Sequence, residues 1–173
     1  CQLDVNEFFN EYGGWCDSMQ DTQRQWNVVP SSDLEFEKIK HLPMLILPSA
    51  LSLTNANFRA LKKYLKNGGR VLATGNTGQR FGPEGHLMKR PESPLKHLER
   101  YANFQRVAAQ PAAPYWLWKK NGEQLALLLE DLDPVVETDA EIHVGVNLSR
   151  SLPGEPKSLS LDLNNNNFDP ETD

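Results

Sequence analysis

The most regular pattern of apolar and polar residues lies between residues 42 and 78, where it changes from strand-like to helix-like and back. Residues 44–47 are an apolar run closed by Pro48, which is typical of a strand buried on both faces. Apolar residues then recur at helical spacing at Phe58, Leu61 and Leu65. Residues 71–74, Val-Leu-Ala-Thr, then predict a second strand. A strand, a helix and a strand in this order predict a right-handed crossover unit of a parallel sheet.

The ends of the predicted helix carry residues suited to helix ends. Thr54 can accept a hydrogen bond from an N–H group of the first turn. Cations that complement the helix dipole lie in the last turns at Lys62, Lys63 and Lys66. Gly68 and Gly69 follow, and a residue just past a helix often needs the positive φ that glycine adopts easily. We therefore expect the helix to span roughly the residues between Thr54 and Gly68.

A polar turn, Gly75-Asn76-Thr77-Gly78, follows the second predicted strand directly. It therefore lies at the carboxyl end of the predicted sheet, where open α/β sheets usually bind their ligands. Backbone amides in such a turn can cradle an anion. We keep Gly75, Asn76 and Thr77 as candidate ligand-binding residues, although a tight turn at the end of a strand explains the same residues.

The neighbouring segments continue the alternation of helices and strands. Residues 3–9 begin a strand or a helix, Gly13-Gly14 interrupts that segment, and residues 26–29 predict a short strand. Residues 104–107 predict a further strand. We therefore predict an α/β domain over residues 1–108, with a parallel sheet flanked by helices as in flavodoxin-like proteins.

The pattern becomes β-like after a low-complexity joint at residues 108–114, so we assign residues 109–173 to a small β-sandwich-like region. Residues 124–129 are strongly apolar, and residues 141–148 and 157–163 alternate between apolar and polar positions. Such alternation predicts an antiparallel sheet with one buried face and one solvated face. Three strands barely make a domain, so these strands either pack on the α/β part or join strands outside this chain.

Two other segments carry candidate binding residues. The loop at 79–94 contains glycines and prolines without periodicity, and loops of that length are often functional or face a partner. His86 in this loop is the histidine we keep as a ligand candidate. Trp116 and Trp118 would form a sugar-stacking platform if they alternated along a strand. A strand buried between two domains explains the same two tryptophans.

Charge and composition narrow the classes of partner. The formal net charge of −5 and the scattered basic residues argue against a nucleic-acid partner. No apolar run reaches the length of a membrane-spanning helix. Cys1 and Cys16 form neither a disulfide framework nor a metal motif, and Cys1 would also fit a lipid anchor. The sequence leaves the location open between the bacterial cytoplasm, secretion and such an anchor.

The crossover unit also carries a resemblance to a known family. Its Pro-Ser, Leu-Ser-Leu-Thr and Asn-Gly-Gly-Arg-Val-Leu-Ala-Thr-Gly segments resemble the class I glutamine-amidotransferase-like fold. More narrowly, residues 42–78 resemble the non-catalytic trimerisation domain of bacterial β-galactosidases and related glycoside hydrolases. A small β-sandwich follows that domain, and residues 124–163 are similar to it. The resemblance implies an oligomerisation or accessory region of a carbohydrate-active hydrolase, with further copies or a neighbouring catalytic domain as partners and carbohydrate as a possible ligand.

The catalytic residues of a working amidotransferase are missing from this sequence. Such an enzyme needs a nucleophilic cysteine on the turn after a central strand, with a histidine and an acid beside it. The corresponding turn here holds Thr74 and Thr77, and Cys16 lies far upstream. The histidines are scattered without the spacing of a metal site, at His41, His86, His97 and His143. We expect no catalytic residue, no metal and no cofactor in this chain.

Two other classes of function remain open. One is a stand-alone enzyme or sugar-utilisation protein of the same fold, with an unrecognised site that uses the Gly75 turn and His86. The other is a module that binds carbohydrate or protein through Trp116 and Trp118. A ligand at the carboxyl ends of the strands would favour the first class, and titration with oligosaccharides would test the second.

Overall fold

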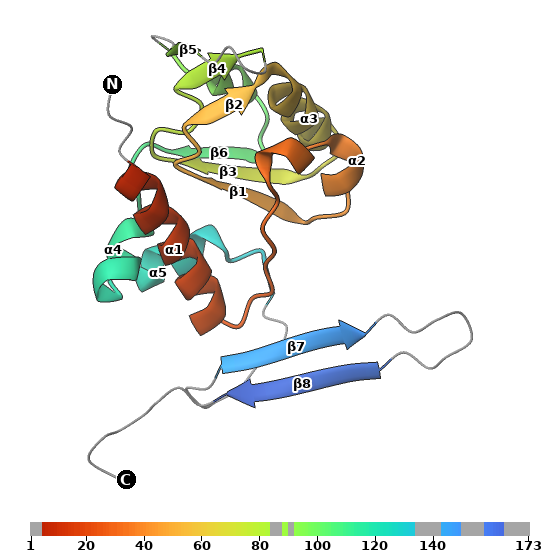
Figure 1. Cartoon of the computed structure of the whole chain (residues 1–173), viewed down its shortest axis with the longest axis vertical. Coiled ribbons are helices and arrows are strands. Elements are labelled where there is room, and N and C mark those ends of the chain that lie inside the picture. The colour runs from red at the N-terminus through yellow and green to blue at the C-terminus, as the bar shows by residue number, and fades with distance from the viewer. Residues whose placement is uncertain (1–4, 84–87, 90–91, 134–142, 150–157, 165–173) are drawn as a thin grey trace.

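The centre of the protein is a sheet of three parallel strands, β1 (Met44–Pro48), β3 (Arg70–Thr74) and β6 (Phe104–Val107), in the order β1-β3-β6 (Figure 1). The register sets Leu45 beside Val71, and Val71 beside Phe104. The computed structural model describes residues 5–83, 88–89, 92–133, 143–149 and 158–164. Within them the chain is a mixed α/β protein, and the strands predicted at 44–47, 71–74 and 104–107 are confirmed.

Helices cover both faces of this sheet (Figure 1). On one face lie α2 (Phe36–Ile39) and α3 (Asn55–Lys66), whose apolar residues share a buried cluster with Leu45, Leu47 and Val71. On the other face lie α1 (Val5–Asp21), α4 (Ala113–Trp118) and α5 (Gly122–Leu128). Their cluster includes Leu72, with Met44 and Ile46 packed against it. Successive residues of the strands thus alternate between two apolar layers, as the predicted buried strands require.

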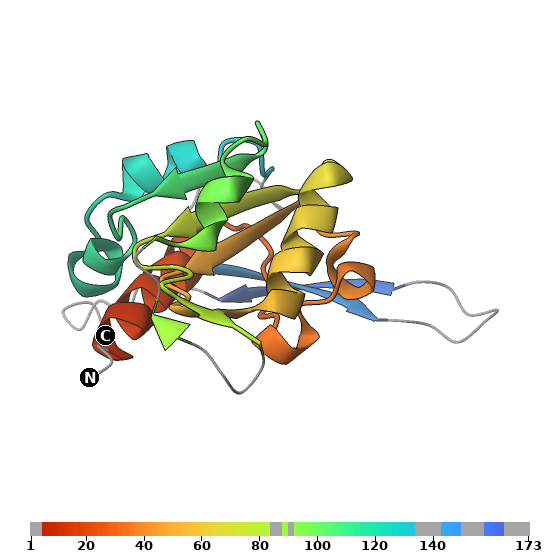
Figure 2. The same cartoon turned by 90° about the horizontal axis from the view of Figure 1, so that it is seen from above.

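Smaller elements surround the central sheet. A second sheet has the order β2-β4-β5, in which β2 (Ser52–Thr54) is parallel to β4 (Arg80–Gly82), and β4 is antiparallel to β5 (Met88–Lys89). Two 3₁₀ turns, η1 (Ser31–Asp33) and η2 (Pro94–Leu98), connect the larger elements. Figure 2, seen from above, shows the second sheet beside α3 at the margin of the central sheet.

An antiparallel hairpin follows the helices, formed by β7 (His143–Ser149) and β8 (Ser158–Asn164). Its register sets Val144 opposite Leu163 and Val146 opposite Leu161. The alternating residues therefore pair apolar positions with apolar positions, as an antiparallel pair with one apolar face requires. The hairpin covers most of the two alternating segments that the sequence predicts as strands.

Three local predictions are wrong. Residues 124–129 lie mostly in α5, residues 115–118 lie in α4, and residues 26–29 belong to no strand. A short apolar run does not distinguish a strand from a buried helix. The helical period of α5 is visible afterwards, because Leu125 and Leu129 are fully buried and Leu127 between them is 67% exposed. The boundary after residue 108 stays a prediction, although α4 and α5 share the buried cluster of α1.

The expected break at Gly13-Gly14 is also wrong, since α1 continues through both glycines. Their role is close packing. A Cβ atom at Gly14 would lie 1.8 Å from the carbonyl oxygen of Ala112, and one at Gly13 would lie 2.7 Å from the Trp116 ring. The missing side chains therefore let α4 lie directly against α1. Glycine costs about 1 kcal/mol inside a helix relative to alanine, and this close approach is the reason for it at these two positions.

The predicted start of α3 is confirmed in detail. The Thr54 hydroxyl accepts a hydrogen bond from the Asn57 N–H at 3.1 Å, and the Asn57 side chain accepts one from the Thr54 N–H at 2.9 Å. The Asn57 amide also donates to the Ser31 carbonyl oxygen at 2.8 Å, which joins η1 to the helix. At the other end Gly68 has a φ of +88°, as the sequence predicts. The two ends of α3 are thus fixed by local sequence.

We expect Thr54→Ala to lower the free energy of unfolding by about 1 kcal/mol, because the Asn57 N–H loses its acceptor. Urea titration followed by circular dichroism would measure this change. Ser52→Ala is the matched control, since it removes an exposed hydroxyl two residues earlier without touching the cap. Equal unfolding midpoints for the two variants would contradict a stabilising role of the cap.

Candidate functional site

The polar turn after β3 is the first candidate, and its residues serve the turn itself. The Thr77 side chain is buried, and its hydroxyl lies 2.8 Å from the Leu47 carbonyl oxygen and 2.7 Å from that of Thr74. The same hydroxyl accepts a hydrogen bond from the Ala50 N–H at 3.0 Å. Thr77 therefore joins the ends of β1 and β3. Its hydrogen bonds explain a threonine at this position without a ligand.

Gly75 is needed in the turn because other segments of the same chain pack closely against it there. It has a φ of +54°, and a Cβ atom would lie 2.2 Å from the Ser49 hydroxyl oxygen. The Gly75 N–H donates to the carbonyl oxygens of Val107 and Ala109, both at 3.0 Å. The Thr77 N–H donates to the Thr74 carbonyl oxygen at 3.3 Å. These two amides are thus hydrogen-bonded within the protein rather than directed at an anion.

Asn76 differs from Gly75 and Thr77 because its side chain takes part in a series of half-buried side-chain hydrogen bonds. The Asn76 amide donates to the Glu7 carboxylate of α1 at 2.7 Å. The Gln79 amide in turn donates to the Asn76 oxygen at 2.7 Å. These planar polar groups lie at the carboxyl edge of the central sheet and line one end of a large groove. Asn76 is the predicted turn residue best placed to meet a ligand.

Ser49, which the sequence reasoning missed, follows β1 directly and lies beside Gly75. It is 3% exposed and has a φ of +45°, which is unusual for a residue other than glycine. A hydroxyl on a sharp turn after a strand is also the arrangement of a nucleophile elbow. In the described part of the chain, however, its oxygen accepts a hydrogen bond from the Gln110 amide at 2.8 Å. An amide cannot take up a proton, so the nucleophile would lack a base.

Glu11 is the other residue that the sequence did not single out, and it is fully buried between α1, β3 and α4. One carboxylate oxygen accepts hydrogen bonds from the Trp15 indole at 2.9 Å and from the Thr74 hydroxyl at 2.7 Å. The other accepts them from the N–H groups of Ala112 at 3.0 Å and Ala113 at 2.9 Å. Burial raises the pKa of Glu11 above its ordinary value, and the four hydrogen bonds act in the opposite direction.

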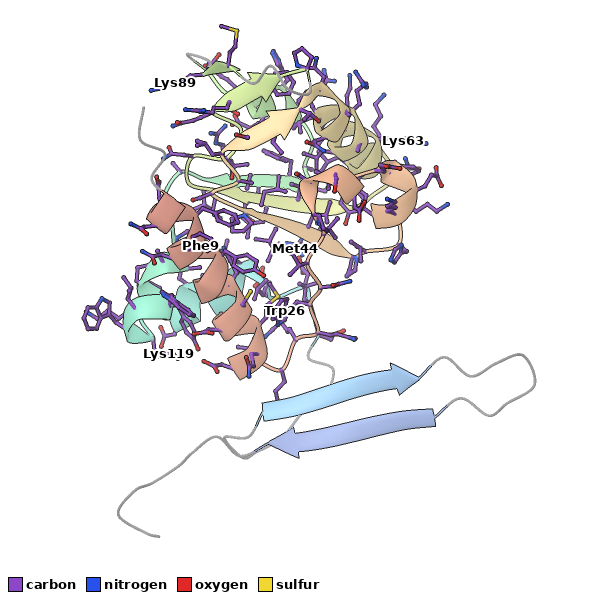
Figure 3. All side chains as sticks on the ribbon, in the orientation of Figure 1. Phe9, Trp26, Met44, Lys63, Lys89 and Lys119 are labelled. Atoms are coloured by element: carbon purple, nitrogen blue, oxygen red, sulfur yellow. The ribbon has the colours of Figure 1, made fainter. Side chains whose placement is uncertain are left out.

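A groove of about 1420 Å³ runs along β1 from this edge. Aromatic residues of α1 form one wall, and residues after α1, including Trp26, form another. Figure 3 labels Met44 on β1 and Trp26 on the segment after α1, and both contribute to the lining. Cys16 also lines the groove as a free thiol. Burial raises the pKa of that thiol, so it lacks the thiolate character of a reactive cysteine.

The two candidate tryptophans lie on α4, away from the polar turn. Trp116 is 50% exposed and Trp118 is 71% exposed. Because α4 is a helix, side chains two positions apart point about 200° from one another. The two rings therefore do not form the flat platform that alternation along a strand would give. Each ring is available only as a separate contact.

The remaining candidates add little to the site. His86 lies outside the described residues, and His41 is among the residues that line the groove. The described residues contain no group of three histidine, cysteine or acidic side chains able to hold a metal ion. Nor does that same part of the chain include a helix both long enough and apolar enough to span a membrane. In comparisons with known proteins, no family model, no curated protein and no solved structure matches this chain.

We expect Glu11→Gln to lower the free energy of unfolding at neutral pH by about 1–3 kcal/mol, because an amide has only one oxygen for four donors. The exposed Glu123→Gln is the matched control. The pKa of Glu11 is higher in the folded protein than in the unfolded chain. The carboxyl therefore stabilises the fold most at low pH, where it is protonated. This contribution falls as the pH rises from the ordinary pKa through the raised one.

Urea titrations of wild type and Glu11→Gln between acid and neutral pH would measure this dependence. The difference in unfolding free energy between them should be largest at the acid end and shrink as the carboxyl ionises. A difference that grows with pH would contradict a raised pKa. Subtracting the unfolding free energies of the two proteins removes the contribution of the titratable groups that they share.

Proposed function

We propose that this chain is a non-catalytic domain of the amidotransferase-like fold, which serves as an oligomerisation or accessory region of a β-galactosidase-like glycoside hydrolase. The non-catalytic part of the proposal is supported by one observation: the hydroxyls of Thr74 and Thr77, at the turn after β3, are both buried and hydrogen-bonded within the protein. Thr74 is fully buried and donates to Glu11, and Thr77 joins the ends of two strands. A substrate carbonyl cannot reach either oxygen without opening the core.

Glu11 contacts the Thr74 hydroxyl, but it is not placed to act as the general base of a Thr74 nucleophile. A general base must be free to take up a proton from its nucleophile in the reacting geometry. Four donors converge on the Glu11 carboxylate; three of them, from Thr74, Ala112 and Ala113, join α1 to β3 and to the start of α4, and the fourth is Trp15 of α1 itself. The carboxylate thus supports a structural role in this proposal. The assignment to a glycoside hydrolase comes from the sequence resemblance alone.

We expect the purified chain to hydrolyse neither glutamine nor a chromogenic galactoside above the rate of a buffer blank. Ammonia release and nitrophenol absorbance would measure the two reactions. Thr74→Val and Thr77→Val serve as controls for contamination, because turnover by another protein would be the same in both preparations. Turnover that survives purification and disappears in either variant would overturn the non-catalytic proposal.

An exposed apolar surface supports the oligomerisation part. Three consecutive residues of α4 are large, apolar and at least half exposed, namely Trp116, Leu117 and Trp118. Phe9 on the adjacent α1 is 57% exposed, and the Trp116 ring lies against Gly13 one turn further along α1. We call these four exposed residues the aromatic surface. The Trp116 and Trp118 rings point apart on α4 and do not form one flat patch, but several large exposed apolar groups on neighbouring helices are typical of protein contacts. The segment 79–94, which the sequence predicts as a loop, contains β4 and β5; it is a second contact candidate, because Met88 on β5 is 65% exposed.

We expect sedimentation velocity to show self-association of the wild-type chain as its concentration rises. Trp118→Ser should shift the sedimentation coefficient towards that of the monomer, because an interface loses most when a large aromatic contact is truncated. Trp26→Ser is the matched control, since it removes an exposed tryptophan that lies on a different segment. A wild-type monomer at every concentration, or an equal effect of both variants, would contradict self-association through the aromatic surface.

A further inference from the structure

The two edges of the central sheet differ in chemistry. The edge strand β6 carries Gln105 and Arg106, and polar or charged residues are how proteins protect the free edge of a sheet. The edge strand β1 is Met-Leu-Ile-Leu-Pro and contains no polar side chain. Among the described strands β1 pairs only with β3, so its outer backbone groups have no ladder partner. A composition of this kind is typical of an internal strand.

The segment after α1 lines the same groove and has no ladder partner among the described strands. Residues 24–30 follow α1 without regular secondary structure. Between Gln25 and Val29 the backbone N–H groups donate to no carbonyl of a described residue, and the Val28 N–H donates only to the Asn27 side chain at 2.8 Å. Val28 is nevertheless 49% exposed and Trp26 is 41% exposed. Both walls of the groove therefore offer backbone groups together with apolar side chains.

Apolar residues line the groove on the sides of both buried clusters, although its lining also includes charged residues such as Arg24, Asp131 and Asp133. Tyr12, Trp15 and Met19 of α1 line the side that packs on one face of the sheet. Leu34 and Leu53, which belong to the cluster on the other face, line the opposite side. The groove volume of about 1420 Å³ exceeds the roughly 300–1,000 Å³ of a typical small-molecule pocket. All five residues of β1 contribute to its lining.

We propose that this groove is the binding site of one extended peptide strand, which adds to the β1 edge by main-chain hydrogen bonds. The strand runs parallel to β1, because sheets covered on both faces are built from parallel strands. It has about five residues, to match β1, and it is apolar at every position, because helix α1 covers one of its faces and the α2–α3 cluster covers the other. Valine and isoleucine fit such a position best.

A second copy of the folded chain does not fit this description. Residues of α1 and of the segment 24–30 line the groove together with β1, and we expect them to keep the β1 edge of a second folded copy from coming alongside. The hairpin strands β7 and β8 alternate between apolar and polar residues. Such a strand would bury polar side chains on one face of the groove. The occupant is therefore a continuously apolar strand supplied by another polypeptide segment, and this proposal does not depend on the aromatic surface or on the proposed function.

The test uses the whole chain and a synthetic peptide in which Val-Ile-Val-Val-Ile is flanked by lysines for solubility. Hydrogen exchange followed by NMR would report the amides of residues 44–47, and the change in tryptophan fluorescence that is lost in a Trp26→Phe variant would report binding to the groove. We expect saturable binding of one peptide per chain, slower exchange at residues 44–47, and unchanged exchange at β6. A peptide with proline at the central position should bind at least about tenfold more weakly, since proline removes a ladder hydrogen bond and disrupts the strand.

Matched variants separate the groove from general apolar binding. Val28→Lys introduces a charge into the wall of the groove at a half-exposed position, and it should abolish peptide binding without unfolding the chain. Leu127→Lys makes the same change on α5 at a 67% exposed position and should leave binding unchanged. Three outcomes would overturn the proposal: no peptide binding, equal binding of the proline peptide, or protection of β1 that depends on protein concentration without any peptide.

Discussion

The buried carboxylate of Glu11 is the constraint that the helical layer beneath the sheet depends on. Removing a charged group from water is costly unless its hydrogen bonds are replaced. The Glu11 carboxylate accepts four hydrogen bonds in place of those to water, from the Trp15 indole, the Thr74 hydroxyl and two N–H groups at the start of α4. Because these donors come from three elements, the charge can be accommodated only when α1, β3 and α4 are assembled together. The interaction thus specifies the arrangement as well as contributing to its stability.

The same carboxylate explains why the strand-end turn has little freedom for chemistry. Thr74 cannot both donate to Glu11 and present its hydroxyl to a substrate, and burial removes it from solvent in any case. Thr77 and Gly75 hold the ends of neighbouring strands close together. What remains accessible is Asn76, at the end of the groove along β1. The polar edge of the sheet is therefore organised mainly as a structural junction.

Apolar surface, rather than polar chemistry, is the more informative feature for function. The aromatic surface on α1 and α4 and the apolar groove beside β1 lie on different parts of the molecule, and each leaves large side chains in water. They call for different kinds of contact. The first offers individual rings on two helices, whereas the second is a groove beside a strand edge that has no ladder partner among the described strands. Both features agree with a chain whose work is done in contact with other polypeptides, as we propose.

The sequence by itself determined the elements whose signals are local. The period of Phe58, Leu61 and Leu65, the Thr54 cap and the glycine at 68 act within a few residues, and the structure reproduces them. Only tertiary structure decided the rest. Gly13-Gly14 looks like a helix break until Ala112 packs against it, and the Trp116 region looks like a strand until α4 is seen on α1. Glu11 is distant in sequence from Thr74 and Ala112, so no local pattern could reveal a junction formed by long-range contact.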